Sequence, residues 1–205
     1  DLVTGVQTCA LPILSVSLEK GGNISLDKEA PGLSSIDIGL GWNERTTDGA
    51  EFDLDASAFL LNGDGRVRSD ADFIFYNNLV STDGSVVHQG DELTGSNDGD
   101  GEVVSVDLSE IPNDVQRVAI GVTIHDSETN KQNFGQVSNA YIRILNRLDS
   151  KEIARYDLSE DYSIETAMIF GELYRHAGEW KFKAIGQGFA GGLGSLAKNY
   201  GVNVG

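Results

Sequence analysis

Alternation of apolar and polar residues with a period of two is the feature of this sequence that most limits its possible fold. It runs in short segments from Leu14 onwards, separated by loops rich in Gly, Asp, Asn and Ser. Successive side chains of a strand point to opposite faces, so each such segment can bury one face and expose the other. The alternating segments span residues 36–42, 52–58, 73–76, 104–108, 118–124, 141–146, 152–158, 167–175 and 179–185. The pattern predicts an all-β protein, a two-sheet antiparallel β-sandwich.

Helix is expected in few places. The segment from Leu193 to Tyr200 predicts a short C-terminal helix, and a helical turn is expected between Glu128 and Gln136. Between the last two alternating segments, His176-Ala177-Gly178 is typical of a hairpin turn.

The first 13 residues differ from the rest of the chain. Asp1 to Ile13 shows no clear period, and we expect it to be a non-native or disordered leader in front of one domain at residues 14–205. The single cysteine, Cys9, lies in this leader, so no disulfide within the chain is expected and a reducing, cytoplasmic compartment is favoured. No apolar run approaches the ~20 residues that span a bilayer, so direct membrane insertion is not expected.

The charge of the chain is strongly negative and unevenly placed. There are 32 acidic and 15 basic residues, a formal net charge of -17. Between Arg45 and Arg117 the sequence holds 16 acidic residues and only two basic ones. Such a chain repels phosphate backbones, so nucleic acid is not an expected partner, whereas cations and basic partners are favoured. The acids could also form a solvated face that only keeps the protein soluble.

Two carboxylates in the string FDLDAS are the first candidates for a functional site. Asp53 and Asp55 flank Leu54, and residues two apart on a strand share a face, about 7 Å apart at the backbone. Two negative groups at that spacing repel each other unless a cation lies between them. The alternative is a pair of solvated carboxylates on an exposed face.

A second acidic segment, DELTGSNDGDGE, spans residues 91–102 and contains no basic residue. Its glycines allow a tight loop, and oxygen ligands on such a loop suit calcium better than magnesium, which prefers a rigid octahedron and keeps its waters. The register partly matches an EF-hand loop, but the flanks predict strand and coil, so we reject an EF-hand. Asn77 and Asn78 follow the segment FIFY, where amide oxygens could bind calcium or simply form a turn. The carboxylates of residues 91–102 and these amides are therefore candidate metal ligands beside Asp53 and Asp55.

The order of several longer strings resembles the TerD family. These strings are KGGNISLDKEAPGL, GLGW, FDLDASAFLL, DFIFYNNL, DGSVVHQGDELTG, FGQVSNAYIRILN, YDLSED, ETAMIFGELYR and WKFKAIGQG. The resemblance covers the chain from about Leu14 to its end and implies a β-sandwich with acidic calcium sites, encoded among genes for tellurite resistance and general stress. Carried over residue by residue, it implies the metal ligands Asp53, Asp55, Asn77, Asn78, Asp91, Asp98, Asp100 and Glu102. It also implies work beside other proteins of that gene group, including a membrane partner.

Two other classes of function remain open from the residues. The acidic face could dock a basic partner without any metal, or Asp53 and Asp55 could serve a small carbohydrate-active enzyme of the sandwich type. Trp42 and Trp180 lie in predicted strands rather than in sugar-stacking loops, which counts against the enzyme. His125-Asp126 is interpreted as the end of a strand and a turn, because no nucleophile with an oxyanion-hole signature accompanies it. We therefore expect a protein that is not an enzyme.

Overall fold

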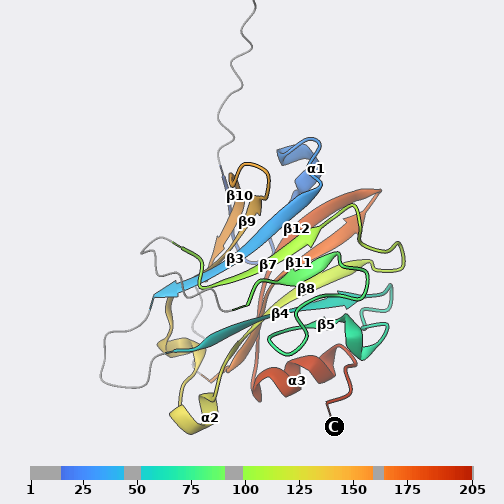
Figure 1. Ribbon diagram of the computed structural model, residues 1–205. Coiled ribbons are helices and arrows are strands. Elements are labelled where there is room, and N and C mark those ends of the chain that lie inside the picture. Colours follow the sequence, from blue (N-terminus) through green and yellow to red (C-terminus); the bar gives the residue numbers. More distant parts are fainter. Residues whose placement is uncertain (1–14, 44–51, 91–98, 159–163, 205) are drawn as a thin grey trace, which may run out of the picture.

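The structure is a computed structural model that describes residues 15–43, 52–90, 99–158 and 164–204. Two sheets pack face to face, as Figure 1 shows, and within the described ranges each has six strands. The predicted two-sheet sandwich is thereby confirmed. The leader expected at residues 1–13 and the candidate ligands Asp91 and Asp98 lie outside the described residues.

Sheet 1 is antiparallel except at one edge. Its strands, in spatial order, are β1 (Val16–Leu18), β10 (Glu152–Asp157), β9 (Ser138–Asn146), β3 (Ser35–Asn43), β7 (Glu102–Asp107) and β6 (Val86–His88). The exception is β1, which pairs with β10 in parallel.

Sheet 2 is antiparallel throughout its described pairings. Its strands, in spatial order, are β2 (Asn23–Ser25), β12 (Glu179–Phe189), β11 (Ala167–His176), β8 (Arg117–Ile124), β4 (Leu54–Leu61) and β5 (Phe73–Ile74). The hairpin between β11 and β12 turns at Ala177 and Gly178, both with positive φ, as the sequence predicts.

The main core lies between the sheets and follows the period-two pattern. Ile36, Ile38 and Leu40 of β3 belong to one cluster of buried side chains with Ala56, Ala58 and Leu60 of β4. Burial of this apolar surface is the main stabilising term in such a sandwich. The alternation read from the sequence therefore orients β3 and β4 correctly.

A second, smaller core lies on the outer face of sheet 2. The helix α3 (Gly192–Asn199) covers it and places Leu196 and Ala197 over Phe59 and Ala119. In Figure 1 this helix lies at the bottom of the view, away from β9 and β10, and it contacts β8, β11 and β12. The predicted C-terminal helix is confirmed. No helix in the described ranges is long and apolar enough to cross a membrane.

The remaining helical elements are single turns. They are α1 (Leu26–Glu29), the 3-10 turn η1 (Asp70–Asp72), α2 (Ser127–Asn130) and the 3-10 turn η2 (Phe134–Gln136). The last two fall in the segment where the sequence predicts a helical turn.

The segment FIFYNN is shorter as a strand than its alternation predicts. The strand β5 ends at Ile74, and the side chain of Tyr76 is 43% exposed. The cause is a turn in which the backbone N–H groups of Phe75 and Asn78 each donate to the other residue's carbonyl. The strand expected over residues 73–76 is therefore shorter than predicted, because local turn closure ends the pairing with β4 after Ile74.

Candidate functional site

The strand β4 places Asp55 on the outer face of sheet 2. Leu54 and Ala56 point into the main core, so the side chain between them points the opposite way, and it is 13% exposed. Asp53 lies just before the strand and is exposed. Asp55 therefore faces away from the core, as the alternation predicts.

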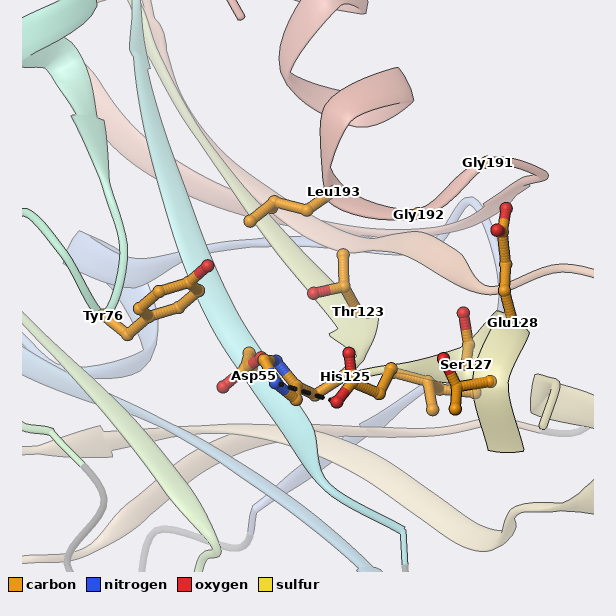
Figure 2. A pocket seen from close by; sticks show the side chains of 12 residues that line it. Asp55, Tyr76, Thr123, His125, Ser127, Glu128, Gly191, Gly192 and Leu193 are labelled. Atoms are coloured by element: carbon orange, nitrogen blue, oxygen red, sulfur yellow. Dashed lines mark ion pairs between the residues drawn. The ribbon is translucent and has the colours of Figure 1, made fainter. Parts of the chain in front are cut away.

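A cavity of about 320 Å³ opens beside Asp55. Its wall includes the side chains of Thr123, His125, Asp126, Ser127 and Glu128 and the backbone at Gly191 and Gly192. Figure 2 shows Asp55 and His125 next to each other, with Tyr76 on one side and Glu128 on the other. Most of these groups present oxygen atoms, and three of them are carboxylates.

The end of β8 brings the histidine to this cavity. Leu54 of β4 lies opposite Ile124 of β8, and the backbone N–H of His125 donates to the carbonyl of Asp53 at 2.8 Å. The His125 ring then lies between two carboxylates, with Nδ1 3.3 Å from Asp55 Oδ2 and Nε2 3.6 Å from Asp126 Oδ2. Asp126 adopts a left-handed conformation with φ 48°, which turns the chain into α2 and brings Glu128 to the wall.

His125, Asp126 and Glu128 were not expected beside Asp55 from the sequence. They lie about 70 residues further along the chain, and only the pairing of β4 with β8 brings them together. Their position at the end of a predicted strand is the signal that could have found them, since strand ends of neighbouring strands meet at one edge of a sheet.

Asp100 lies on a different face of the sandwich, the outer face of sheet 1. Its carboxylate accepts hydrogen bonds from Arg143 Nε at 2.9 and 3.1 Å and from the Tyr141 hydroxyl at 3.0 Å. The side chain of Asp100 is only 5% exposed. Burial lowers the pKa of Arg143, but Asp100, with Tyr141 and Glu152, more than offsets this, so the pKa of Arg143 is raised overall. Asp100 is thus already bound to a cation of the chain itself.

Two glycines make room for this arrangement on β3. A Cβ at Gly39 would lie 1.9 Å from Asp100 Oδ2, and one at Gly41 would lie 2.3 Å from the Tyr141 ring. The side chains of Asp100 and Tyr141 therefore occupy the space that larger residues at these two positions would need.

We predict that Gly39→Ala destabilises the fold by about 2–4 kcal/mol, because it displaces the Asp100 carboxylate from Arg143. Denaturant unfolding measures this change. The matched control is Gly194→Ala in α3, where a Cβ meets nothing within 4 Å. That substitution should instead stabilise the protein by about 0.5–1 kcal/mol. Equal effects of the two substitutions would contradict the close packing of Asp100 on Gly39.

Glu102 lies inside the sandwich, at the start of β7. Its Oε2 accepts from the backbone N–H of Ala56 at 3.2 Å and lies 3.0 Å from His88 Nε2. The backbone N–H of Gly90 donates to His88 Nδ1 at 3.0 Å, so in the neutral imidazole the proton is on Nε2, facing Glu102. The two side chains are 1% and 4% exposed, so Glu102 links sheet 1 to the backbone of β4 from within.

Asn77 and Asn78 follow the short strand β5. Asn77 is exposed. The side-chain amide of Asn78 donates to the Phe73 carbonyl at 2.7 Å and to the Ala71 carbonyl at 3.3 Å. The turn alternative therefore describes Asn78 well, since its amide nitrogen holds the turn together.

The described acidic candidate ligands thus divide among three places. Asp53 and Asp55 lie at the outer face of sheet 2, Glu102 lies between the sheets, and Asp100 lies at the outer face of sheet 1. Among the residues that the structure describes, no three His, Cys, Asp or Glu side chains lie close enough together to hold a metal ion. Of the candidate ligands that the structure describes, Asp55 lines the oxygen-rich cavity of about 320 Å³.

Fold and site together define a class of protein: a two-sheet β-sandwich with an acidic, oxygen-lined cavity where β4 begins and a helix packed on the outside of one sheet. The TerD domain family matches residues 14–200, so the chain belongs to the TerD family.

Similar proteins are named for tellurium resistance and general stress. The chain is 59% identical to the tellurium resistance protein TerD of Serratia marcescens over 93% of this chain and 99% of that protein. It is 54% identical to the general stress protein 16U of Bacillus subtilis (strain 168), over 94% of this chain and 100% of that protein. A solved homologue of telluride resistance protein (TerD) from Streptomyces coelicolor A3(2) has a TM-score of 0.62 at 25% identity, covering 81% of this chain and 96% of the other.

Proposed function

We propose that this member of the tellurium resistance and general stress protein family is a non-catalytic, calcium-binding module. Calcium is expected to bind at Asp53 and Asp55, at the start of β4. There it would stabilise the acidic loops around them or switch their conformation. The observation that carries the proposal is the position of Asp55 in a cavity whose wall also holds Asp126, Glu128 and several hydroxyl groups.

The donor set fits calcium by its chemistry. Carboxylate, hydroxyl and backbone carbonyl oxygens are the ligands that this ion takes, in a flexible shell of six to eight. The carboxylates of Asp55 and Asp126 lie on either side of His125 and leave the cavity with an excess of negative charge at neutral pH. A bound divalent cation would remove that repulsion.

The other predicted ligands would contribute differently. Asp100 would have to leave Arg143, and Glu102 would have to leave His88 and the Ala56 N–H, before either could join an ion at the surface. We therefore expect Asp53 and Asp55 to be the main ligands of the described part of the chain. Asp91 and Asp98 are proposed as further ligands from the acidic segment of residues 91–102.

Location and partners belong to the same proposal. We infer a cytoplasmic protein that works with other proteins of the tellurium resistance group, among them a membrane partner. The net charge of -17 supports partners that are cationic or that bind through calcium. An acidic surface that docks a basic partner without any metal is the second candidate, and the excess of acids is the observation that favours it.

A carbohydrate-active enzyme has less support. A glycosidase needs two carboxyl groups on either side of a bound sugar. Here the side chain of Asp55 faces His125, and Trp42 and Trp180 lie in β3 and β12, where they pack with the main core. The tryptophan positions agree with those expected from the sequence.

An NMR titration with calcium tests the proposed function directly. We expect the amide signals of residues 53–56 and 123–128 to shift and saturate with calcium, because both segments border the cavity. Magnesium at the same concentration should cause much smaller shifts. Shifts that stay outside both segments would place the calcium site elsewhere, and no shifts at about 10 mM calcium would favour the metal-independent interaction protein.

A further inference from the structure

The outer face of sheet 2 has a second polar area, beyond the part that α3 covers. Cross-strand pairing sets Arg117 of β8 beside Tyr174 of β11, and Glu172 of β11 beside Lys183 of β12. Their neighbours Val118, Leu173 and Phe182 point into the main core, so these four side chains point outward. The area is built on three adjacent strands, which hold the side chains in fixed relative positions.

A cavity of about 560 Å³ opens over these residues. Its wall includes Arg117, Lys183, Arg175 and Tyr174, with Glu172 and Asn23 between them. A cavity of this size lies within the range that holds small molecules in proteins. It is separate from the cavity beside Asp55, with which it shares no lining residue.

The cavity is locally basic in a chain that is otherwise strongly acidic. Two outward-pointing cationic side chains line it, those of Arg117 and Lys183, against one carboxylate, that of Glu172. Arg117 and Glu172 form only a long ion pair, with 3.9 Å between Nη1 and Oε2. One carboxylate cannot neutralise two cations, so an excess of positive charge remains for a bound anion.

Arg175 also borders the cavity, but its side chain lies on the other side of β11, the side of Leu173. It donates hydrogen bonds to the carbonyls of Ile111 and Val115, at 2.8 and 3.1 Å, and its guanidinium lies 4.4 Å from the centroid of the Trp180 ring. The positive charge that faces the cavity therefore comes from Arg117 and Lys183.

Neutral hydrogen-bond donors complete the cavity. Burial, and then the charge of Glu172, raise the pKa of Tyr174, so its hydroxyl keeps its proton at neutral pH and can donate. Burial also raises the pKa of Glu172, although Arg117 and Lys183 oppose this shift. Asn23 of β2 lies beside Lys183 and brings an amide group to the same wall.

We propose that this cavity binds a small oxyanion such as phosphate, held by Lys183 and Arg117 and oriented by the Tyr174 hydroxyl. Oxyanions offer several acceptor oxygens and a negative charge, and they match cationic groups and hydroxyl donors that converge from adjacent strands. Glu172 opposes binding through its own negative charge and sets the affinity of the site. The site is independent of calcium.

Isothermal titration of the full chain with inorganic phosphate tests the proposal. The buffer is made calcium-free with a chelating resin, so that no dissolved chelator competes as an anion, and its counter-ion is chloride. We expect saturable binding that weakens as sodium chloride is added. Sodium tellurite, titrated in parallel, shows which oxyanion the cavity prefers. No saturable binding of either oxyanion at about 10 mM would overturn the proposal.

Three variants show whether the binding occurs in this cavity. Lys183→Gln should weaken the affinity for phosphate about tenfold, the usual effect of losing one charged hydrogen bond. The charge-matched control, Lys151→Gln, lies on the hairpin between β9 and β10 of sheet 1 and should leave the affinity unchanged. Glu172→Gln should instead tighten binding several-fold, because it removes the competing charge.

The opposite signs of the two cavity variants make the test specific, since a damaged fold would weaken binding in both. Equal weakening by Lys183→Gln and Lys151→Gln would show that only overall charge matters, and would refute the assignment to this cavity. Weaker binding in Glu172→Gln would refute the role given to that carboxylate.

Discussion

Calcium at a hundredfold excess over its dissociation constant is expected to raise the free energy of unfolding by about 2.7 kcal/mol, or roughly 5–10 °C in melting temperature. An ion that binds only the folded state stabilises it by this amount through mass action. Thermal unfolding with and without calcium measures the shift. The expected gain arises because the carboxylates near Asp55 change from mutually repelling groups into ligands.

The double variant Asp53→Asn with Asp55→Asn should lose most of this gain. It nearly preserves shape and removes two charges, so the calcium-free protein should unfold at the same temperature or slightly higher. The matched control is Asp64→Asn with Glu110→Gln, which removes the same charge from two exposed positions outside the cavity. A full calcium response in the Asp53–Asp55 variant would place the site elsewhere. A lost response in both double variants would show a diffuse charge effect rather than a site.

Phe59→Ala is expected to destabilise the fold by about 3–5 kcal/mol, the largest effect that we predict for a single substitution. Phe59 is fully buried on the outer face of β4, and its ring stacks on Phe73 at 4.7 Å and contacts Tyr200 at 4.8 Å between centroids. The substitution removes the centre of the second core and with it the surface on which α3 packs. Denaturant unfolding measures the change.

Two further substitutions serve as controls for the size of this effect. Phe59→Leu fills part of the space and should destabilise the protein by about 1–2 kcal/mol. Leu148→Ala removes a side chain that is 81% exposed and should change the stability by less than about 0.5 kcal/mol. If Phe59→Ala lowered the stability no more than Leu148→Ala, α3 would not be packed on this face in solution.

The strands were predictable because their pattern is local. The alternation of Ile36, Ile38 and Leu40 orients β3 whatever its neighbours are, and Ala177-Gly178 turns the chain by its own backbone preference. The C-terminal helix was predictable for the same reason. Short-range periodicity and turn chemistry thus suffice for element type and for which face is buried.

The division of the acidic residues among three places was not predictable in this way. Asp100 and Glu102 are two apart in sequence, yet one meets Arg143 outside sheet 1 and the other meets His88 inside the sandwich. These partners are fixed by the pairing of β3 with β9 and of β6 with β7, which no local pattern reveals. For the same reason the sequence alone could not bring His125 to Asp55.

The pairing of the two N-terminal strands has a consequence for how the chain folds as it is made. The strand β1 needs β10, about 140 residues later, and β2 needs β12, about 160 residues later. A chain emerging from the ribosome can therefore complete neither sheet until most of its length has been synthesised. Until then the apolar faces of β1 and β2 lack their partner strands. The many carboxylates of the growing chain would repel other growing chains through like charge and so limit their association.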